Sequence, residues 1–154
     1  MRSITALIFA LTLVISPLVM ASSYPLDQVL PKAAVTKLAK TAIHDTDGLL
    51  SKGASKTKRV KLAKDTGLGL AQLTSWVFMA DLVRVKGVGP QMARLLEAAK
   101  VPTVAKLRRQ GAGSLFKRMM EVNKTQKISD NPPSKSQVAH WIRLARKLKI
   151  VARP

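Results

Sequence analysis

Apolar side chains recur at helical spacing along most of the chain. A stripe at positions i, i+3, i+4 and i+7 runs from Met92 to Ala99, which is the pattern of a helix buried along one side. The same spacing recurs from Val138 to Leu148. No segment sustains the alternation of β-branched and polar residues that a half-buried strand requires. The pattern therefore predicts an all-α protein.

Residues that favour helix ends flank these stripes. Ser134 precedes the last stripe and Gln137 follows three positions later, which is the spacing of a capping box. Asp45 and Asp47 precede an apolar segment, so we interpret them as capping residues rather than as an acidic site. Glycines that we expect to end helices are Gly53, Gly67, Gly87 and Gly111.

The chain contains two similar halves. A shift of 58 residues brings Leu38, Ile43, Leu49, Gly53 and Ala54 onto Leu96, Val101, Leu107, Gly111 and Ala112. A shift of 65 brings Trp76 onto Trp141, and the chain has no other tryptophan. The second half is therefore longer, with an insertion expected near residues 123–133. We predict a tandem helical repeat with copies at 22–85 and 86–149, followed by a C-terminal tail at 150–154.

The first 21 residues have the pattern of an export signal. Arg2 precedes an apolar run that ends near Val14, and a proline and a small residue, Ala21, follow. The run is shorter than the roughly 20 residues that a membrane-spanning helix needs. We expect residues 1–21 to be a cleaved signal peptide, which touches the membrane only transiently, and the protein to be exported to the periplasm or secreted. An uncleaved membrane anchor is the alternative.

Composition and charge narrow the classes of function. The chain has 27 Lys+Arg, 8 Asp+Glu and no Cys, and its formal net charge is +19. The absence of cysteine excludes disulfide scaffolds, thiolate zinc sites and thiol nucleophiles. The few acids are scattered, and neither His44 nor His140 stands within a catalytic pattern. We therefore expect no enzyme, no metal, no cofactor and no small-molecule substrate, but an anionic partner.

One segment, residues 82–99, closely resembles the helix-hairpin-helix motif. Its two glycines permit a tight turn, while the valine between them is expected to fill the core. Pro90 suits the first position of the following helix. Backbone amides of the turn and of that helix can then face a phosphate oxygen. The predicted DNA-binding residues are Lys86, Gly87, Val88, Gly89, Gln91 and Arg94.

Other turns depart from this motif. The corresponding stretch of the first half, residues 29–32, has no glycine, so we expect that degenerate hairpin only to pack. Gly67-Leu68-Gly69 is a weak variant of the pattern, which we interpret as an ordinary turn between helices. For residues 87–89 the alternative to DNA binding is a helix-packing turn in a scaffold that binds no nucleic acid.

Over about residues 28–149 the chain also resembles a bacterial family of uncharacterised helix-hairpin-helix proteins, a domain of unknown function. The resemblance rests on Leu49-Leu50, Gly53-Ala54, Leu62-Ala63, Thr66-Gly67, Trp76-Val77, Ala80-Asp81-Leu82, Lys86-Gly87-Val88-Gly89, residues 95–99, Thr103-Val104, Glu121-Val122-Asn123, Pro133-Ser134 and Trp141-Ile142. It implies a compact tandem helical domain related to DNA-binding folds, and it implies no established activity.

Basic residues form three clusters in the sequence. They are Lys52, Lys56, Lys58, Arg59, Lys61 and Lys64; Lys106, Arg108, Arg109, Lys117 and Arg118; and Arg143, Arg146, Lys147 and Lys149. Together they exceed what solubility requires and fit phosphate neutralisation. We therefore predict a non-enzymatic module that binds double-stranded DNA without sequence preference. The alternative is an interaction protein that binds anionic envelope polymers, lipid or a partner protein.

Overall fold

The computed structural model describes residues 23–153, and the predicted signal peptide lies outside this range. Within it the chain forms eight α-helices and one 3-10 turn, with no β-strand. The elements are η1 (Leu26–Gln28), α1 (Lys32–Ala39), α2 (Thr46–Gly53), α3 (Lys56–Thr66), α4 (Leu70–Leu82), α5 (Pro90–Ala98), α6 (Val104–Leu107), α7 (Ala112–Gln126) and α8 (Lys135–Lys147). The all-α prediction is confirmed.

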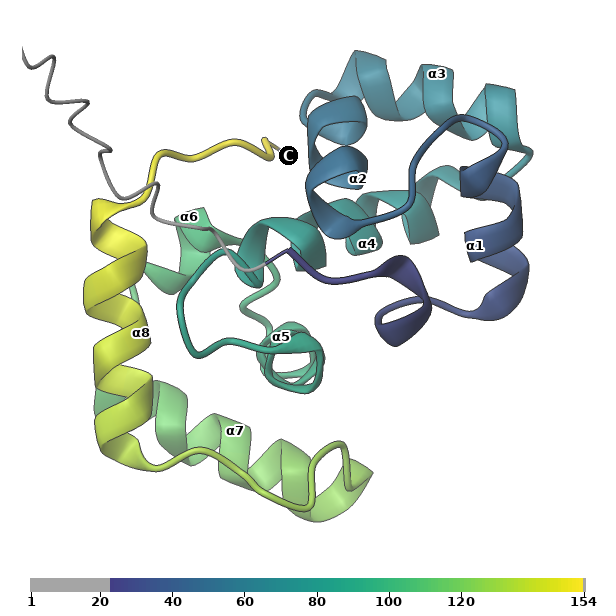
Figure 1. Cartoon of the computed structure of the whole chain (residues 1–154). Coiled ribbons are helices and arrows are strands. Elements are labelled where there is room, and N and C mark those ends of the chain that lie inside the picture. The colour runs from purple at the N-terminus through teal and green to yellow at the C-terminus, as the bar shows by residue number, and fades with distance from the viewer. Residues whose placement is uncertain (1–22, 154) are drawn as a thin grey trace, which may run out of the picture.

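The helices form two groups that share one core. Helix α4 packs on α2 and α3 of the first group and also on α5 and α6 of the second, while α8 packs on α6 and α7. In Figure 1, α3 lies at the upper right, α7 and α8 lie at the lower left, and α4 and α5 lie between them. Leu73 of α4 and Leu96 of α5 are fully buried members of one continuous apolar cluster. Helix α4 therefore links the two groups.

The helices of the two groups recur in the same order and with similar offsets along the chain. Helices α1 and α5 begin 58 residues apart, as do α2 and α6, whereas α4 and α8 have equal lengths and begin 65 residues apart. The turns after α1 and α5 are also alike, because Ala42 and Lys100 both have left-handed backbones, with φ of 56° and 66°. The next residue in each turn, Ile43 or Val101, donates its amide back to a helix carbonyl.

The connection before α8 is longer than its counterpart before α4. Residues 127–134 take the place of residues 67–69. The side-chain amide of Asn123 holds this connection, because it donates to the Ser129 carbonyl and accepts from the Ser129 amide, both at 2.8 Å. The Ser129 hydroxyl donates in turn to Oε1 of Gln91 at 3.1 Å. The longer connection thus lies against the start of α5.

The helix ends largely follow the capping residues. Asp45 caps α2 by accepting an amide of its first turn at 2.7 Å, and the capping box at Ser134 is present. Gly67 ends α3 in the left-handed conformation. The expectations that Gly87 and Gly111 end helices are wrong. Helix α4 already stops at Leu82, and α6 stops at Leu107, so that Gly111 is instead the N-cap of α7.

Arg59 lies in the core, although it belongs to the first basic cluster of the sequence. Its side chain is only 2% exposed. One guanidinium nitrogen donates to the Gly53 carbonyl at 3.0 Å and another to the Arg153 carbonyl at 2.8 Å. The guanidinium carbon stands 5.3 Å from the ring centre of Phe78. Burial lowers the pKa of Arg59 below its usual value. This residue therefore holds chain segments together and adds no surface charge.

The segment after α8 is part of the fold rather than a loose tail. In Figure 1 it runs from the end of α8 across to the first group of helices. The amide of Arg153 donates to the Ala54 carbonyl at 3.1 Å, and the Ala152 amide donates to the buried carboxylate of Asp81 at 3.4 Å. Arg84 pairs with the same carboxylate at 2.5 Å. Burial raises the pKa of Asp81, and the Arg84 pair opposes that rise.

Candidate nucleic-acid interface

The turn between α4 and α5, residues 83–89, has the backbone that the glycine pattern predicted. Gly87 has a left-handed φ of 92°, and Gly89 is the extended N-cap residue before Pro90. Val88 between them is 1% exposed, so its predicted core position is confirmed. The Val88 amide donates to the Val85 carbonyl at 2.8 Å and closes the turn. The turn therefore exposes Gly87, leaves Gly89 half-buried and buries the valine between them.

Trp141 of α8 lies directly beneath this turn. A Cβ atom at Gly87 would stand 2.9 Å from the indole Nε1, closer than real Cβ contacts. Trp141 is 3% exposed and Trp76 is 7% exposed, so both tryptophans are buried as predicted. The indole at the turn is a feature that the apolar stripe of α8 could not reveal, because only the tertiary structure brings α8 against residues 83–89.

Several backbone amides at the turn have no acceptor within residues 23–153. They belong to Lys86, Gly87 and Gly89 in the turn and to Gln91 and Met92 in the first turn of α5. The first amides of a helix have no partner within the helix itself. The amides of Gln91 and Met92 also stand at the positive end of the α5 helix dipole, which favours a nearby anion. The turn and the start of α5 thus form one surface of open hydrogen-bond donors.

The predicted side chains around these amides have different roles. Lys86 is exposed, and its ammonium group forms no hydrogen bond or ion pair with the described residues. Gln91 is exposed and accepts the Ser129 hydroxyl. Arg94 is also exposed, but one of its guanidinium nitrogens donates to the Val29 carbonyl at 2.7 Å. Lys86 and Arg94 therefore both bring a positive charge to the turn, and Arg94 also links α5 to the first group of helices.

The first group offers fewer donors at the corresponding place. Pro31 occupies the position of Gly89 before α1, and proline has no amide hydrogen. Pro31 and Trp76 line one shallow pocket of about 190 Å³. In each group the tryptophan of the last helix therefore lies beside the start of that group's first helix. Trp76 of α4 lies beside α1, and Trp141 of α8 lies beside the turn that leads into α5. Only the second group surrounds that place with glycine amides.

The comparison with protein families bears on the same region. A family model described as a domain of unknown function, DUF4332, matches residues 28–148. The chain belongs to the DUF4332 family. No curated protein and no solved structure matches it. This match confirms that the chain resembles a domain of unknown function, and the family description names no activity.

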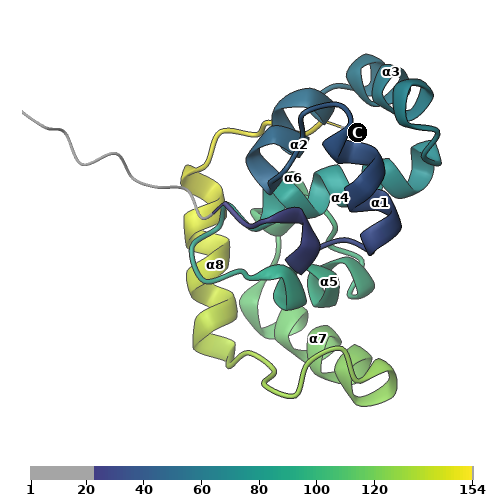
Figure 2. The ribbon, with the colours of Figure 1, turned by 45° about the vertical axis from the view of Figure 1, so that its right-hand side comes forward.

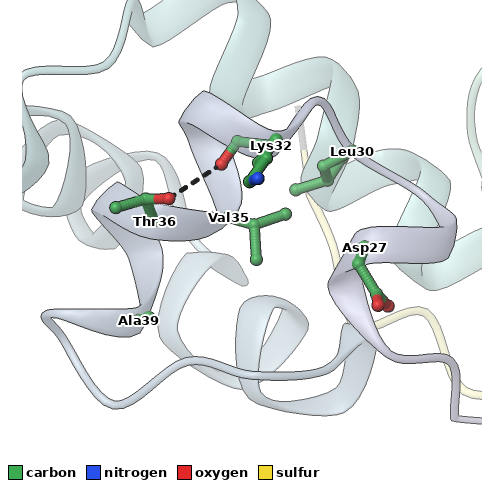
Figure 3. Close-up of a pocket in the computed structure, with 6 residues that line it drawn as sticks. All are labelled: Asp27, Leu30, Lys32, Val35, Thr36 and Ala39. Carbon is green, nitrogen blue, oxygen red and sulfur yellow. Dashed lines mark hydrogen bonds between the residues drawn. The ribbon is translucent and has the colours of Figure 1, made fainter.

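Figure 3 shows a pocket of about 610 Å³ between η1 and α1 of the DUF4332 domain. Leu30 and Val35 give it apolar walls, and the Thr36 hydroxyl donates to the Lys32 carbonyl at 3.0 Å. Asp27 is its one acidic residue. Within residues 23–153 no group of His, Asp and Glu is arranged to hold a metal ion. The pocket lining therefore suggests no metal or acid–base chemistry.

A second pocket of the DUF4332 domain, of about 450 Å³, lies between α2 and α3 and is basic. Lys52, Lys58 and Lys61 line it, and Lys61 pairs with Asp65 at 2.7 Å. The Lys58 ammonium group donates to the Ser51 carbonyl at 3.1 Å. Apart from the buried Arg59, the first basic cluster of the sequence is thus exposed along α2 and α3.

No helix among the described residues is long and apolar enough to cross a membrane.

The two histidines of the DUF4332 chain are both exposed. His140 shares a hydrogen bond of 2.9 Å with Arg143, while His44 accepts the Leu26 amide through its backbone carbonyl. The α4–α5 turn, with its open amides and the exposed Lys86, is the strongest candidate site of the domain.

Proposed function

We propose that this chain is a non-enzymatic module that binds double-stranded DNA through its phosphate backbone, without sequence preference. The observation that carries the proposal is the α4–α5 turn, where the amides of Lys86, Gly87 and Gly89 are open beside an exposed lysine. Amides and lysines bind phosphate oxygens whatever the base sequence. The formal net charge of the whole chain is +19, and only Arg2 of its charged residues lies in the predicted signal peptide, so the mature chain keeps a strong attraction to a polyanion.

In this proposal α4, the turn and α5 form a helix-hairpin-helix motif, and the two groups of helices are tandem copies of one unit. The matched order of the helices supports the duplication, as does the shared offset of 58 residues from α1 to α5 and from α2 to α6. So do the left-handed turns at Ala42 and Lys100. The second copy alone has kept the donor-rich hairpin, because Pro31 removes an amide from the first.

The proposed donors differ slightly from those that the sequence alone suggested. Val88 contributes no donor, because its amide closes the turn and its side chain is buried. The amides of Lys86, Gly87, Gly89 and Gln91 face the phosphate, with the Lys86 ammonium group and the free part of the Arg94 guanidinium beside them. The exposed lysines of α2 and α3 add long-range attraction, which dissolved salt screens.

The proposed site of action lies outside the cytoplasm. It rests on the sequence pattern of residues 1–21, which lie outside the described residues. Mass spectrometry of the protein from its native source tests this proposal. We expect a mature chain that begins near Ser22, and soluble protein that retains Met1 would contradict export.

DNA binding is tested by titrating fluorescently labelled duplexes of unrelated sequence over a range of salt concentrations. We expect similar affinities for all duplexes, and a linear fall of log affinity with log salt, with a slope of about −0.9 per neutralised phosphate. The Lys86→Ala/Arg94→Ala variant should bind every duplex more weakly. Its slope should be shallower by about one unit per lost contact.

The matched control is Lys56→Ala/Lys64→Ala on α3, which removes the same charge. Helix α3 lies on the opposite side of the molecule from the α4–α5 turn in Figures 1 and 2. We expect a smaller loss of affinity in the control, and thermal unfolding must show that both variants are folded. Equal losses would show that diffuse charge rather than the hairpin binds DNA. Binding to anionic vesicles but not to duplexes would favour an envelope-binding protein instead.

A further inference from the structure

Trp141 is a buried residue whose indole N–H has no hydrogen-bond partner within residues 23–153. Trp141 is 3% exposed, and its Nε1 forms no hydrogen bond with the described residues. Within residues 23–153 the one fully enclosed side-chain nitrogen or oxygen that lacks a partner is Nε of Arg59. Nε1 of Trp141 is therefore not fully enclosed. The small exposed part of this ring includes its only polar atom.

That nitrogen opens at the donor-rich face of the α4–α5 turn. It stands 2.9 Å from the position that a Cβ of Gly87 would occupy, so the missing side chain of Gly87 leaves its N–H uncovered. The amides of Lys86, Gly87 and Gly89 in the same turn have no acceptor among the described residues. An indole N–H can only donate a hydrogen bond. The open amides of the turn and the indole N–H thus all require an acceptor at the same place.

We propose that Trp141 is a DNA-binding residue, whose indole N–H donates to the phosphate oxygen held by the α4–α5 turn. This inference rests on the proposed function and names a donor that the hairpin sequence does not contain. The ring is fixed by core packing, so little side-chain freedom is lost when the hydrogen bond forms. The donor is neutral, so it strengthens binding without releasing a counterion from the DNA.

The neutral donor leads to a distinctive result in a titration. Trp141→Phe keeps the apolar ring and removes the N–H, so the affinity should fall by roughly threefold to tenfold, as for one net hydrogen bond. The salt slope should stay unchanged, in contrast to the shallower slope of a Lys86 variant. Trp76→Phe is the matched control, because Trp76 lies beside Pro31, where the corresponding amide is missing. Its affinity should match that of the original chain.

Nuclear magnetic resonance reports on the same hydrogen bond in the unaltered protein. The ¹⁵N-labelled chain has two indole N–H groups, and the Trp76→Phe variant assigns the signal of Trp141. Addition of a duplex should move the Trp141 signal downfield and leave the Trp76 signal in place. This measurement holds even if Trp141→Phe fails to fold.

Two results would overturn the inference in different ways. If the duplex binds with the expected salt dependence but the Trp141 indole signal does not move, the proposed DNA function stands and the role of Trp141 is refuted. The same conclusion follows if folded Trp141→Phe binds with unchanged affinity. If the original chain binds no duplex at all, both the proposed function and the inference fail.

Discussion

Gly87 is required for two separate reasons. Its φ of 92° lies in the left-handed region, which residues with a Cβ rarely adopt. Trp141 also leaves no room for a Cβ at that position. Gly69 is different, because its φ is −63° and a Cβ there would meet no atom within 4 Å. Gly87 and Gly69 come from similar Gly-x-Gly sequences, but only the structure around Gly87 requires a residue without a side chain.

Alanine substitutions at these two glycines test the difference. Gly87→Ala should lower the free energy of unfolding by about 2 kcal/mol or more, because the left-handed backbone alone costs roughly 1–2 kcal/mol and the added methyl group crowds Trp141. Gly69→Ala should change it by less than about 1 kcal/mol. Urea unfolding followed by circular dichroism measures both. Equal effects at the two positions would show that the turn does not require Gly87.

At the scale of the elements, the contact between α2 and α4 depends on a small residue. Gly53 is the last residue of α2 and is buried, and a Cβ there would run into the side chain of Val77 on α4. The carbonyl of Gly53 also accepts the Arg59 guanidinium. The two helices approach closely at this point, so the absence of a side chain sets their separation.

Gly53→Ala is expected to destabilise the protein, although alanine favours an isolated helix by roughly 1 kcal/mol over glycine. Overpacking against Val77 should cost about 1–3 kcal/mol. Val77→Ala makes room for the new methyl group, so the double variant should lose less stability than the sum of the two single variants. Urea unfolding of all four proteins gives the coupling energy. Simple additivity would mean that the two side chains do not meet.

At the scale of the whole molecule, the C-terminal segment closes the structure. It leaves α8 of the second group and bonds to Ala54 and Arg59 of the first, while Ala152 reaches Asp81. A segment that the sequence predicts to be only a short C-terminal tail thus provides an acceptor for the buried Arg59 and a donor for the buried Asp81. The two groups of helices are therefore joined at α4 and again through this segment.

Deletion of residues 150–154 should lower the free energy of unfolding by about 3 kcal/mol or more, because it leaves the buried Arg59 without its Arg153 carbonyl. Arg153→Ala is the control. The bonds from Arg153 use its backbone only, so this variant should change stability by less than about 0.5 kcal/mol. Thermal and urea unfolding measure both variants. A deletion that unfolds like the original chain would show that the segment does not hold the groups together.

Local patterns were enough to predict the helices and the core valine of the turn. Helix periodicity, the cap at Asp45 and the capping box at Ser134 involve residues three or four apart, so their partners lie within the same short segment. Val88 was predictable for the same reason, because a turn between two apolar stripes leaves few places for its side chain. Membership of the DUF4332 family could likewise be predicted from motifs along the chain.

The packing of distant segments sets the roles of residues whose partners lie far away in the sequence. Arg59 looked like a surface charge until its acceptor on Arg153 was known, and Arg94 reaches Val29 across the two groups. The indole of Trp141 lies beside Gly87 because α8 packs against the α4–α5 turn, which no spacing within α8 reveals. The side-chain type fixes which hydrogen bonds a residue can form, but the packing of distant elements determines which partner it meets.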